Sequence, residues 1–425
     1  MLNKILSKIK SDTDVPLWTR DYSILTIGSI VSYMGTSTMY FIIGLWVLDY
    51  SKSILYYSLY LFLHNLTKII VPIVAGPYLD RFSRRKAIYT LDYISAGVFL
   101  SLFFLFGTNF FGYATIAVFT VIISAIDSVY HVAFSSFFPM LVHEKNLTKA
   151  YSVFSVIETV SYFMIPLATF LYHLVGIRPV FLGGAVVYCI AATTEVFIRA
   201  KEEYTSKEKS LGLKKYAADL KEGLKLFKTE KALLYIVLTY LFIYAIFGMQ
   251  NTVLLPYFRD TFKNGDYWYM LAMGATLSGR FSSGFMLYFM RVAKKHRYAI
   301  TLIGFIIFAI CSMFTISTKI IFIIVCLQYY AGVCDAVCYN FQSSATMFML
   351  DDDKKGRYNG VFSTVANAGL LCGDLLGGLL SGVMLLTTIN FTVSAVALVA
   401  VIILFFVLGR NSIKKLFIGE SDKNG

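Results

Sequence analysis

The groups of this sequence best suited to do chemistry are charged side chains inside long apolar stretches. Six of them lie well within such stretches: Lys68, Asp127, Glu158, Arg280, Asp335 and Asp374. A charge at the centre of a membrane costs roughly 2.5–3.5 kcal/mol on insertion scales, so each is a candidate for ion pairing, substrate binding or proton transfer. Two further acids, Asp92 and Glu195, lie nearer the ends of their stretches, and we expect them at the membrane interface.

A proton-binding group is predicted around Asp127. His131 follows Asp127 by four residues, which places the two side chains one turn apart on the same helix face, where they can share a proton. The hypothesis is that Asp127, together with Glu158 or Asp374, binds a proton that drives the activity of the protein. The alternative is that these acids are neutral, hydrogen-bonded packing elements.

The composition requires these charges to be held by membrane-spanning elements. Of the 425 residues, 57% are hydrophobic and 15% are charged, whereas soluble domains carry about 25% charged residues. The mean hydropathy of +0.68 agrees with this. A soluble enzyme and a disordered chain are excluded, and a polytopic all-α membrane protein remains. The six cysteines all fall in apolar stretches, so neither a disulfide framework nor a metal site is expected.

Twelve apolar stretches are long enough to cross a membrane, which takes about 20 residues in a helix. We expect spans at 22–48, 54–76, 87–107, 113–138, 150–174, 179–198, 232–256, 267–290, 298–317, 320–348, 358–386 and 389–408. The first residues do not resemble a cleaved signal peptide. They predict a short amphipathic helix with lysines on its polar face.

The positive residues set the expected orientation. With both termini in the cytoplasm, the cytoplasmic segments hold 31 of the 38 Lys and Arg residues, the outer loops hold 5, and the spans hold 2. Such an excess of Lys and Arg in cytoplasmic loops is typical of multi-pass membrane proteins. It also accounts for the net charge of +13 without nucleic acid as a partner.

One long polar segment divides the spans into two groups of six. The predicted organisation is a cytoplasmic amphipathic N-terminus (1–21), an N-terminal six-helix bundle (22–198), a cytoplasmic linker (199–231), a C-terminal six-helix bundle (232–408) and a cytoplasmic tail (409–425). The bundles repeat one another at an offset of 208 residues, because Asp127–Ser136 is similar to Asp335–Ser344 and Val153–Ser155 is similar to Val361–Ser363. Internal repeats of this kind are typical of transporters with pseudo-symmetric halves.

The loop after the second span carries a family signature. Its sequence, Gly76-Pro-Tyr-Leu-Asp-Arg-Phe-Ser-Arg-Arg-Lys86, resembles the loop signature Gly-x-Leu-x-Asp-Arg-x-Gly-Arg-Arg/Lys of the major facilitator superfamily, and the matching residues are Gly76, Asp80, Arg81, Arg84 and Arg85. This loop and the run 356–363 are similar to the macrolide-efflux and siderophore-exporter branch of drug–proton antiporters. Ser83 departs from the signature glycine. Antiporters usually carry a Gly-x-x-x-Gly-Pro-x-x-Gly-Gly motif in helix five, where this chain has only Pro166; the repeat-equivalent helix eleven has the same glycine frame (369–378) with Asp374 in place of proline.

The resemblance implies twelve helices in two pseudo-symmetric six-helix bundles. It places helix five against helix eight and helix two against helix eleven, which implies two buried ion pairs, Glu158–Arg280 and Lys68–Asp374. It also implies that Asp80 binds helix eleven as a latch that holds the cytoplasmic side closed. The alternative for the loop is that its positive charges only fix the orientation.

The resemblance further implies a central cavity lined by helices four and ten, which carry Asp127 and Asp335. Tyrosines and side-chain amides that could face this cavity are candidate substrate contacts: Tyr40, Tyr130, Gln250, Asn251, Tyr339, Asn340 and Gln342. Side chains of this kind suit a bulky, partly apolar solute. The alternative is a chance lining, because 16% of all residues are aromatic.

These observations predict a secondary active transporter that works by alternating access, uses a proton gradient and needs no cofactor. The expected activity is export of amphipathic drugs or a related metabolite, by a monomer in the plasma membrane, such as a bacterial inner membrane. The expected partners are the bilayer, protons and the small-molecule substrate. The alternative is a proton-coupled uptake symporter for a polar or anionic nutrient, bound by Lys68 and Arg280. A membrane-embedded enzyme is disfavoured, because no catalytic or phosphate-binding motif lies in or beside a span.

Overall fold

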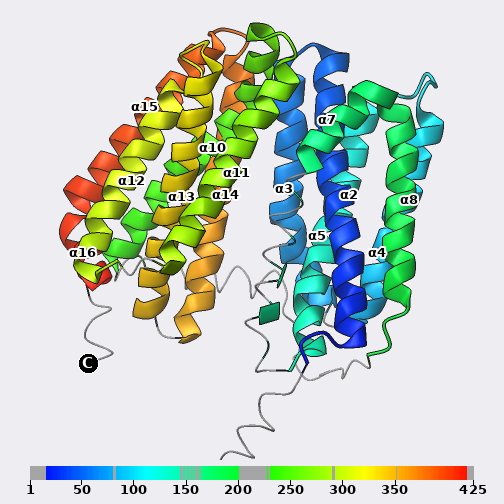
Figure 1. Ribbon diagram of the computed structural model, residues 1–425, viewed down its shortest axis with the longest axis horizontal. Helices are drawn as coiled ribbons and strands as arrows, with labels where there is room; N and C mark the ends of the chain where they lie inside the picture. The colour runs from blue at the N-terminus through cyan, green and yellow to red at the C-terminus, as the bar shows by residue number, and fades with distance from the viewer. Residues whose placement is uncertain are drawn as a thin grey trace, which may run out of the picture. The chain divides into compact units, whose positions relative to one another are not determined.

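The structure, a computed structural model, is built from helices throughout the residues that it describes. These residues are 16–79, 83–143, 164–200, 230–289, 292–350 and 352–418, with a few single positions between 146 and 161 and Phe227. The helices are α2 (Arg20–Ser51), α3 (Ile54–Leu79), α4 (Arg84–Leu105), α5 (Tyr113–Phe137), η1 (Phe138–Leu141), α7 (Met164–Val175), α8 (Ile177–Val196), α10 (Lys231–Thr261), α11 (Gly265–Phe289), α12 (Lys294–Phe314), α13 (Ile321–Met349), α14 (Asp352–Leu380), α15 (Leu386–Val401), the π-helix η3 (Ile402–Leu408) and α16 (Arg410–Ile418) (Figure 1). The predicted all-α class is confirmed.

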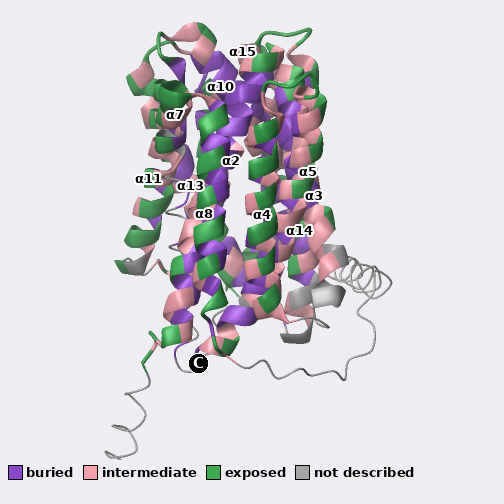
Figure 2. Ribbon diagram, turned by 90° about the vertical axis from the view of Figure 1, so that its right-hand side faces the viewer, coloured by how far each residue is buried: buried purple, intermediate pink, exposed green. Residues whose placement is uncertain are grey.

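Ten of these helices are long and apolar enough to cross a membrane. The predicted span 267–290 forms α11, which is not among the ten, and the predicted span 150–174 is described mainly in its last part, α7. The count of twelve therefore stays a prediction. Exposed residues run along the outer faces of α4 and α8 (Figure 2), and many of them are large and apolar, such as Leu100, Phe104 and Val186. Such faces fit the hydrocarbon region of a bilayer.

The first of two compact units comprises residues 1–46 and 70–212. Its helix α4 packs along both α8 and α5. Ser83 caps the start of α4, because its hydroxyl accepts a hydrogen bond from the backbone N–H of Lys86 at 3.1 Å. Within the unit, the rings of Phe99 on α4 and Tyr188 on α8 stack with centroids 5.4 Å apart. The helices α2, α4, α5 and α8 thus enclose one interior.

The second unit comprises residues 47–69 and 213–425. The end of α2 and the larger part of α3 therefore pack with this unit, although the predicted N-terminal bundle, 22–198, includes them. Helices α10 and α14 form its most extensive pairing and run side by side in Figure 1. Their contact depends on glycine: a Cβ on Gly373 would overlap the carbonyl oxygen of Ala245, and one on Gly369 would overlap that of Leu241. Small residues at such spacing allow two backbones to touch.

Helices α11 and α13 approach each other in the same way. A Cβ on Gly279 of α11 would overlap the carbonyl oxygen of Tyr329, and a Cβ on Gly332 of α13 would overlap that of Thr276. This close approach fixes the position of Arg280, which follows Gly279 in the chain, relative to α13.

Candidate functional site

The centre of the second unit contains an ion pair between Arg280 on α11 and Asp335 on α13. The Nη2–Oδ2 distance is 2.7 Å, and the side chains are 44% and 12% exposed. The guanidinium carbon of Arg280 also lies 5.3 Å from the ring centroid of Phe247 on α10, within cation–π range. Residues of α13 and α10 thus balance the positive charge of Arg280, whose side chain stays partly exposed.

A cavity of about 370 Å³ opens beside this ion pair, between α10, α13 and α14. Its lining consists only of uncharged side chains: Tyr244, Tyr339, Ser343, Asn359, Phe362, Ser363, Ala366 and Asn367. Tyr244 lies within electrostatic range of both Asp335 and Arg280, so it connects the cavity with the ion pair. The combination of aromatic rings, amides and hydroxyls can bind a solute that is partly apolar and forms a few hydrogen bonds.

A second acid of this unit, Asp374 on α14, is completely buried. Its Oδ2 accepts a hydrogen bond of 2.9 Å from the amide of Asn65 on α3, and its Oδ1 has no hydrogen-bond partner among the described residues. The predicted Lys68–Asp374 pair is replaced by this amide contact, while Lys68 itself is exposed.

The first unit contains a pair of buried acids that the sequence placed at the interface. Asp92 on α4 is 2% exposed and Glu195 on α8 is 0% exposed. Their position at the membrane interface stays a prediction, whereas their burial among helices was not predicted. Glu195 lies near the end of α8. Ile198, which follows the helix, is also buried, so other parts of the unit cover this end of α8.

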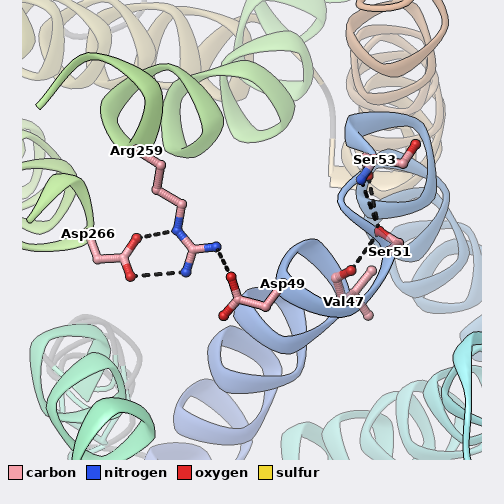
Figure 3. A network of polar contacts seen from close by, with 6 residues as sticks. All are labelled: Val47, Asp49, Ser51, Ser53, Arg259 and Asp266. Carbon is pink, nitrogen blue, oxygen red and sulfur yellow. Dashed lines mark hydrogen bonds and ion pairs between the residues drawn. The ribbon is translucent and has the colours of Figure 1, made fainter.

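A third polar network lies where α2 ends. Arg259 of α10 donates from Nη1 to Asp49 of α2 at 2.7 Å, and from Nε and Nη2 to the two carboxylate oxygens of Asp266 of α11 (Figure 3). Beside it, the Ser51 hydroxyl donates to the carbonyl of Val47 at 2.7 Å and caps the end of α2. One guanidinium group thus joins three helices of the second unit, a charge-assisted arrangement of high directional specificity.

The predicted substrate contacts separate into three groups. Tyr339 lines the cavity, as expected. Tyr130, Gln250 and Gln342 are buried, and two of them form hydrogen bonds that serve packing: Tyr130 donates to Glu195, and Gln342 donates to Tyr358. The others are Tyr40 and Asn251, which are half-buried, and Asn340, which is exposed and donates to the carbonyl of Ala336.

The remaining predicted site residues lie on or near α3, α4 and α5. Asp127 is half-buried within electrostatic range of Asp92, and His131 is exposed, with its ring 6.0 Å from that of Phe154. Gly76 lies within α3, and Arg84 and Arg85 begin α4, where Arg84 donates to the carbonyl of Ser136 at 3.4 Å. Glu158, Asp80 and Arg81 lie outside the described residues, so the pair Glu158–Arg280 and the latch stay predictions.

Two sites, the Arg280–Asp335 ion pair and the Arg259 network, were not predicted, although the sequence contains signals for both. Arg280 and Asp335 were each singled out as buried charges, but their mutual pairing depends on the rotation of α11 about its axis, which hydropathy does not determine. Arg259 lies in a predicted outer loop, and Asp49, Asp260 and Asp266 lie in predicted loops on the same side. Opposite charges at neighbouring helix ends were therefore the available signal.

The chain resembles transporters in sequence family and in fold. The sequence matches the family described as Major Facilitator Superfamily over residues 25–369. No curated protein sequence matches the chain. Among solved structures, the nucleoside transporter NupG has a TM-score of 0.69 at 12% identity, with 91% of this chain and 98% of that chain covered. A variant of the peptide transporter POT in complex with alafosfalin has a TM-score of 0.71 at 14% identity, with 95% and 97% covered.

A third solved structure is a bacterial homolog of the human lysosomal transporter Spinster in an inward-facing, unoccupied conformation. Its TM-score is 0.65 at 12% identity, with 94% of this chain and 97% of that chain covered. At these identities the likeness shows the fold alone. The family match covers most of the chain and indicates a multi-pass membrane transporter rather than an enzyme. The protein belongs to the Major Facilitator Superfamily.

Proposed function

We propose that the protein is a proton-coupled secondary transporter that works by alternating access and exports amphipathic solutes, as drug–proton antiporters do. Family membership supplies the transporter class, and the loop resemblance around residues 76–86 supports the antiporter branch. The proposal includes a monomer in the plasma membrane of a cell, such as a bacterial inner membrane, with the proton gradient as energy source and no cofactor or nucleic acid.

The observation that carries the proposal is the chemistry of the cavity between α10, α13 and α14. Its lining offers the rings of Tyr244, Tyr339 and Phe362 together with the amides of Asn359 and Asn367. Its volume of about 370 Å³ lies within the range of about 300–1,000 Å³ found for small-molecule sites. Aromatic faces with a few hydrogen-bonding groups favour a partly apolar solute over a strongly charged one.

The neighbouring ion pair supports the same substrate class. The charge of Arg280 is balanced by Asp335 at 2.7 Å, so the cavity is not flanked by a net positive charge of the kind that an anionic nutrient would require. An anion that displaced Asp335 from Arg280 would leave a buried carboxylate without its partner, which disfavours binding.

The second candidate function is proton-coupled uptake of a polar or anionic nutrient. It is supported by the 44% exposure of the Arg280 side chain, which leaves part of the guanidinium accessible. The solved structures of similar fold are also described as nucleoside and peptide transporters, whose substrates are polar. Under this alternative Arg280 exchanges Asp335 for the substrate.

A susceptibility and vesicle experiment separates the two functions. The gene is expressed in a bacterial host that lacks its major drug pumps, and growth is scored against ethidium and a macrolide beside an empty-vector control. Everted membrane vesicles from the same cells are then energised, and ethidium fluorescence is followed before and after the pH gradient is dissipated. Export predicts increased resistance and ethidium accumulation that collapses with the gradient. Unchanged susceptibility, combined with gradient-driven uptake of a nucleoside or dipeptide by whole cells, would support the uptake alternative.

A further inference from the structure

The interior of the first unit contains two acids that no predicted role uses. Asp92 of α4 and Glu195 of α8 are 2% and 0% exposed, and α4 packs along α8. Both lie within the helices that cross the membrane. Carboxyl groups in such a place are expensive to retain, because an ionised group there has lost its hydration.

The hydrogen bonds around the pair follow one pattern. The hydroxyl of Tyr130 on α5 donates to Glu195 Oε1 at 2.7 Å. The hydroxyl of Ser32 on α2 donates to Asp92 Oδ1 at 3.1 Å. Ser29, one turn before Ser32, lies 3.4 Å from the Tyr130 hydroxyl. One oxygen of each carboxyl group is thus held by a hydroxyl, and Tyr130 and α2 take part in both surroundings through Ser29 and Ser32.

The other oxygen of each carboxyl group is unpartnered. Asp92 Oδ2 and Glu195 Oε2 are buried and have no hydrogen-bond partner among the described residues. The titratable groups that face the pair are Asp127 and Tyr130 on α5, Tyr188 on α8 and Tyr33 on α2. These groups are acidic or phenolic, and no basic side chain of the described residues acts on either acid.

We propose that Asp92 and Glu195 form a proton-binding site in which the two carboxyl groups together hold the coupling proton. The proton arrives from water, forms an O–H bond at Glu195 Oε2 or Asp92 Oδ2, and later leaves to water, so the pair changes its charge by one unit. Tyr130 and Ser32 hold the opposite oxygens and thereby orient the acids. The claim that this proton drives transport rests on the proposed function, whereas the proton site itself rests on the geometry of the pair.

The same geometry favours a proton over a metal ion. No group of three or more His, Cys, Asp or Glu residues suited to a metal ion occurs within the described part of the chain. The side chain of Glu195 also fills the space against α2, since a Cβ on Gly28 would lie 2.6 Å from its Cγ. A hard cation needs several oxygen ligands around it, and this contact leaves little room for them, whereas a proton needs one lone pair.

Infrared difference spectroscopy on the full-length protein in lipid membranes tests the site without a substrate. Spectra are recorded between about pH 5 and about pH 9, a range in which buried carboxyl groups can titrate. The expected result for the wild type is a pH-dependent carbonyl band of a protonated carboxylic acid. This band should weaken in Glu195→Gln and in Asp92→Asn, and the contributions of both acids should be lost in the double variant. It should lie below the frequency of a carbonyl group without hydrogen bonds, because a proton on Oδ2 or Oε2 leaves Oδ1 or Oε1 as the carbonyl oxygen, and these accept hydrogen bonds from Ser32 and Tyr130.

Two further variants serve as controls for the assignment of the band. Tyr130→Phe retains both acids but removes the hydrogen bond to Glu195, so it should shift the Glu195 contribution and leave that of Asp92 in place. Asp260→Asn changes an exposed acid of α10 and is the matched control, which should leave the band unchanged. The proposal is overturned if the double variant keeps the wild-type band. It is also overturned if sodium ions at constant pH remove the band of the wild type, because the site would then bind sodium.

A transport measurement separates this inference from the proposed function. In everted vesicles, Glu195→Gln and Asp92→Asn should lose pH-gradient-driven ethidium transport, and Asp260→Asn should keep it. If wild-type vesicles do not respond to the gradient, the proposed function fails, while the infrared spectra still decide the proton site. If the wild type responds and both carboxyl variants respond equally, the proton site fails and the proposed function stands.

Discussion

Arg280 on α11 and Asp335 on α13 form an ion pair with an Nη2–Oδ2 distance of 2.7 Å, near a cavity of uncharged side chains. Tyr244, which lines the cavity, lies within electrostatic range of both members of the pair. The two members come from helices whose backbones touch at Gly279 and Gly332. The position of the pair predicts a role in the stability of the second unit as well as in substrate choice.

The ion pair should show energetic coupling between its two members. Arg280→Ala and Asp335→Ala should each lower the thermal stability of the purified protein, and the double variant should lose less than the sum of the two. Because the Arg280 side chain is 44% exposed, solvent screening limits the coupling to about 1 kcal/mol. Thermal unfolding in detergent micelles measures all four proteins, and strictly additive losses would contradict the pairing.

The amide–acid contact between Asn65 and Asp374 should tolerate exchange of its members. Asn65→Asp places two carboxyl groups side by side and should destabilise the protein by about 1–3 kcal/mol, because a buried acid then lacks its donor. The reciprocal variant, Asn65→Asp with Asp374→Asn, restores one amide and one acid and should recover most of the loss. The comparison of unfolding temperatures decides this, and a double variant less stable than Asn65→Asp alone would argue against the contact.

The glycines of α14 should differ sharply in their tolerance of a methyl group. Gly373→Ala forces a Cβ against the carbonyl oxygen of Ala245 and should cost about 1–3 kcal/mol, the usual effect of overpacking. Gly360→Ala on the same helix is the matched control, because its Cβ would meet no atom within 4 Å. Yield of monodisperse protein and thermal unfolding measure the difference. Equal behaviour of the two variants would refute the close packing of α10 against α14.

The guanidinium group of Arg259 should require its planar shape and not only its charge. Arg259→Lys keeps one positive charge but cannot contact Asp49 and both oxygens of Asp266 in the same geometry. We expect Arg259→Lys to lose about 1–2 kcal/mol of stability and Arg259→Ala to lose more. Unfolding at low and high salt is the measurement, and a lysine variant as stable as the wild type would show that charge alone suffices.

The cavity should select its solute through the ring of Tyr339. Under the proposed function, Tyr339→Ala should raise the half-saturating ethidium concentration about 10-fold, which corresponds to ~1.4 kcal/mol of binding, while Tyr339→Phe keeps the ring and should change it little. Initial transport rates in everted vesicles over a range of ethidium concentrations measure this. The cavity assignment fails if Tyr339→Ala transports ethidium with wild-type saturation.

Much of the fold could be predicted from the sequence, because apolar length and positive charge respond to the membrane directly. The predicted span 113–138 and the helix α5 (Tyr113–Phe137), for example, differ by one residue at one end. The predicted span 320–348 and α13 (Ile321–Met349) differ by one residue at each end. Helix ends follow hydropathy closely because each end exchanges the bilayer for water.

The partners of the charged residues could be predicted only in part. Counting residues along a helix gives the depth of a side chain but not the direction in which it points, so the pairing of Arg280 with Asp335 could not be predicted from hydropathy. The burial of Asp92 and Glu195 could not be predicted for a related reason, since distance from a helix end indicates depth in the membrane and not contact with other helices. Neighbouring helices cover both acids, and the sequence does not report that coverage.

The glycine contacts of α14 have a mechanical consequence for Asp374. Where backbone meets backbone, as at Gly369 and Gly373 against α10, there is no layer of side chains over which one helix can slide, so α10 and α14 move as one rigid element. The surroundings of Asp374 on that side are then constant. Its only adjustable neighbour among the described hydrogen bonds to the carboxylate is Asn65 of α3, and a displacement of α3 is the motion that would expose this acid to water.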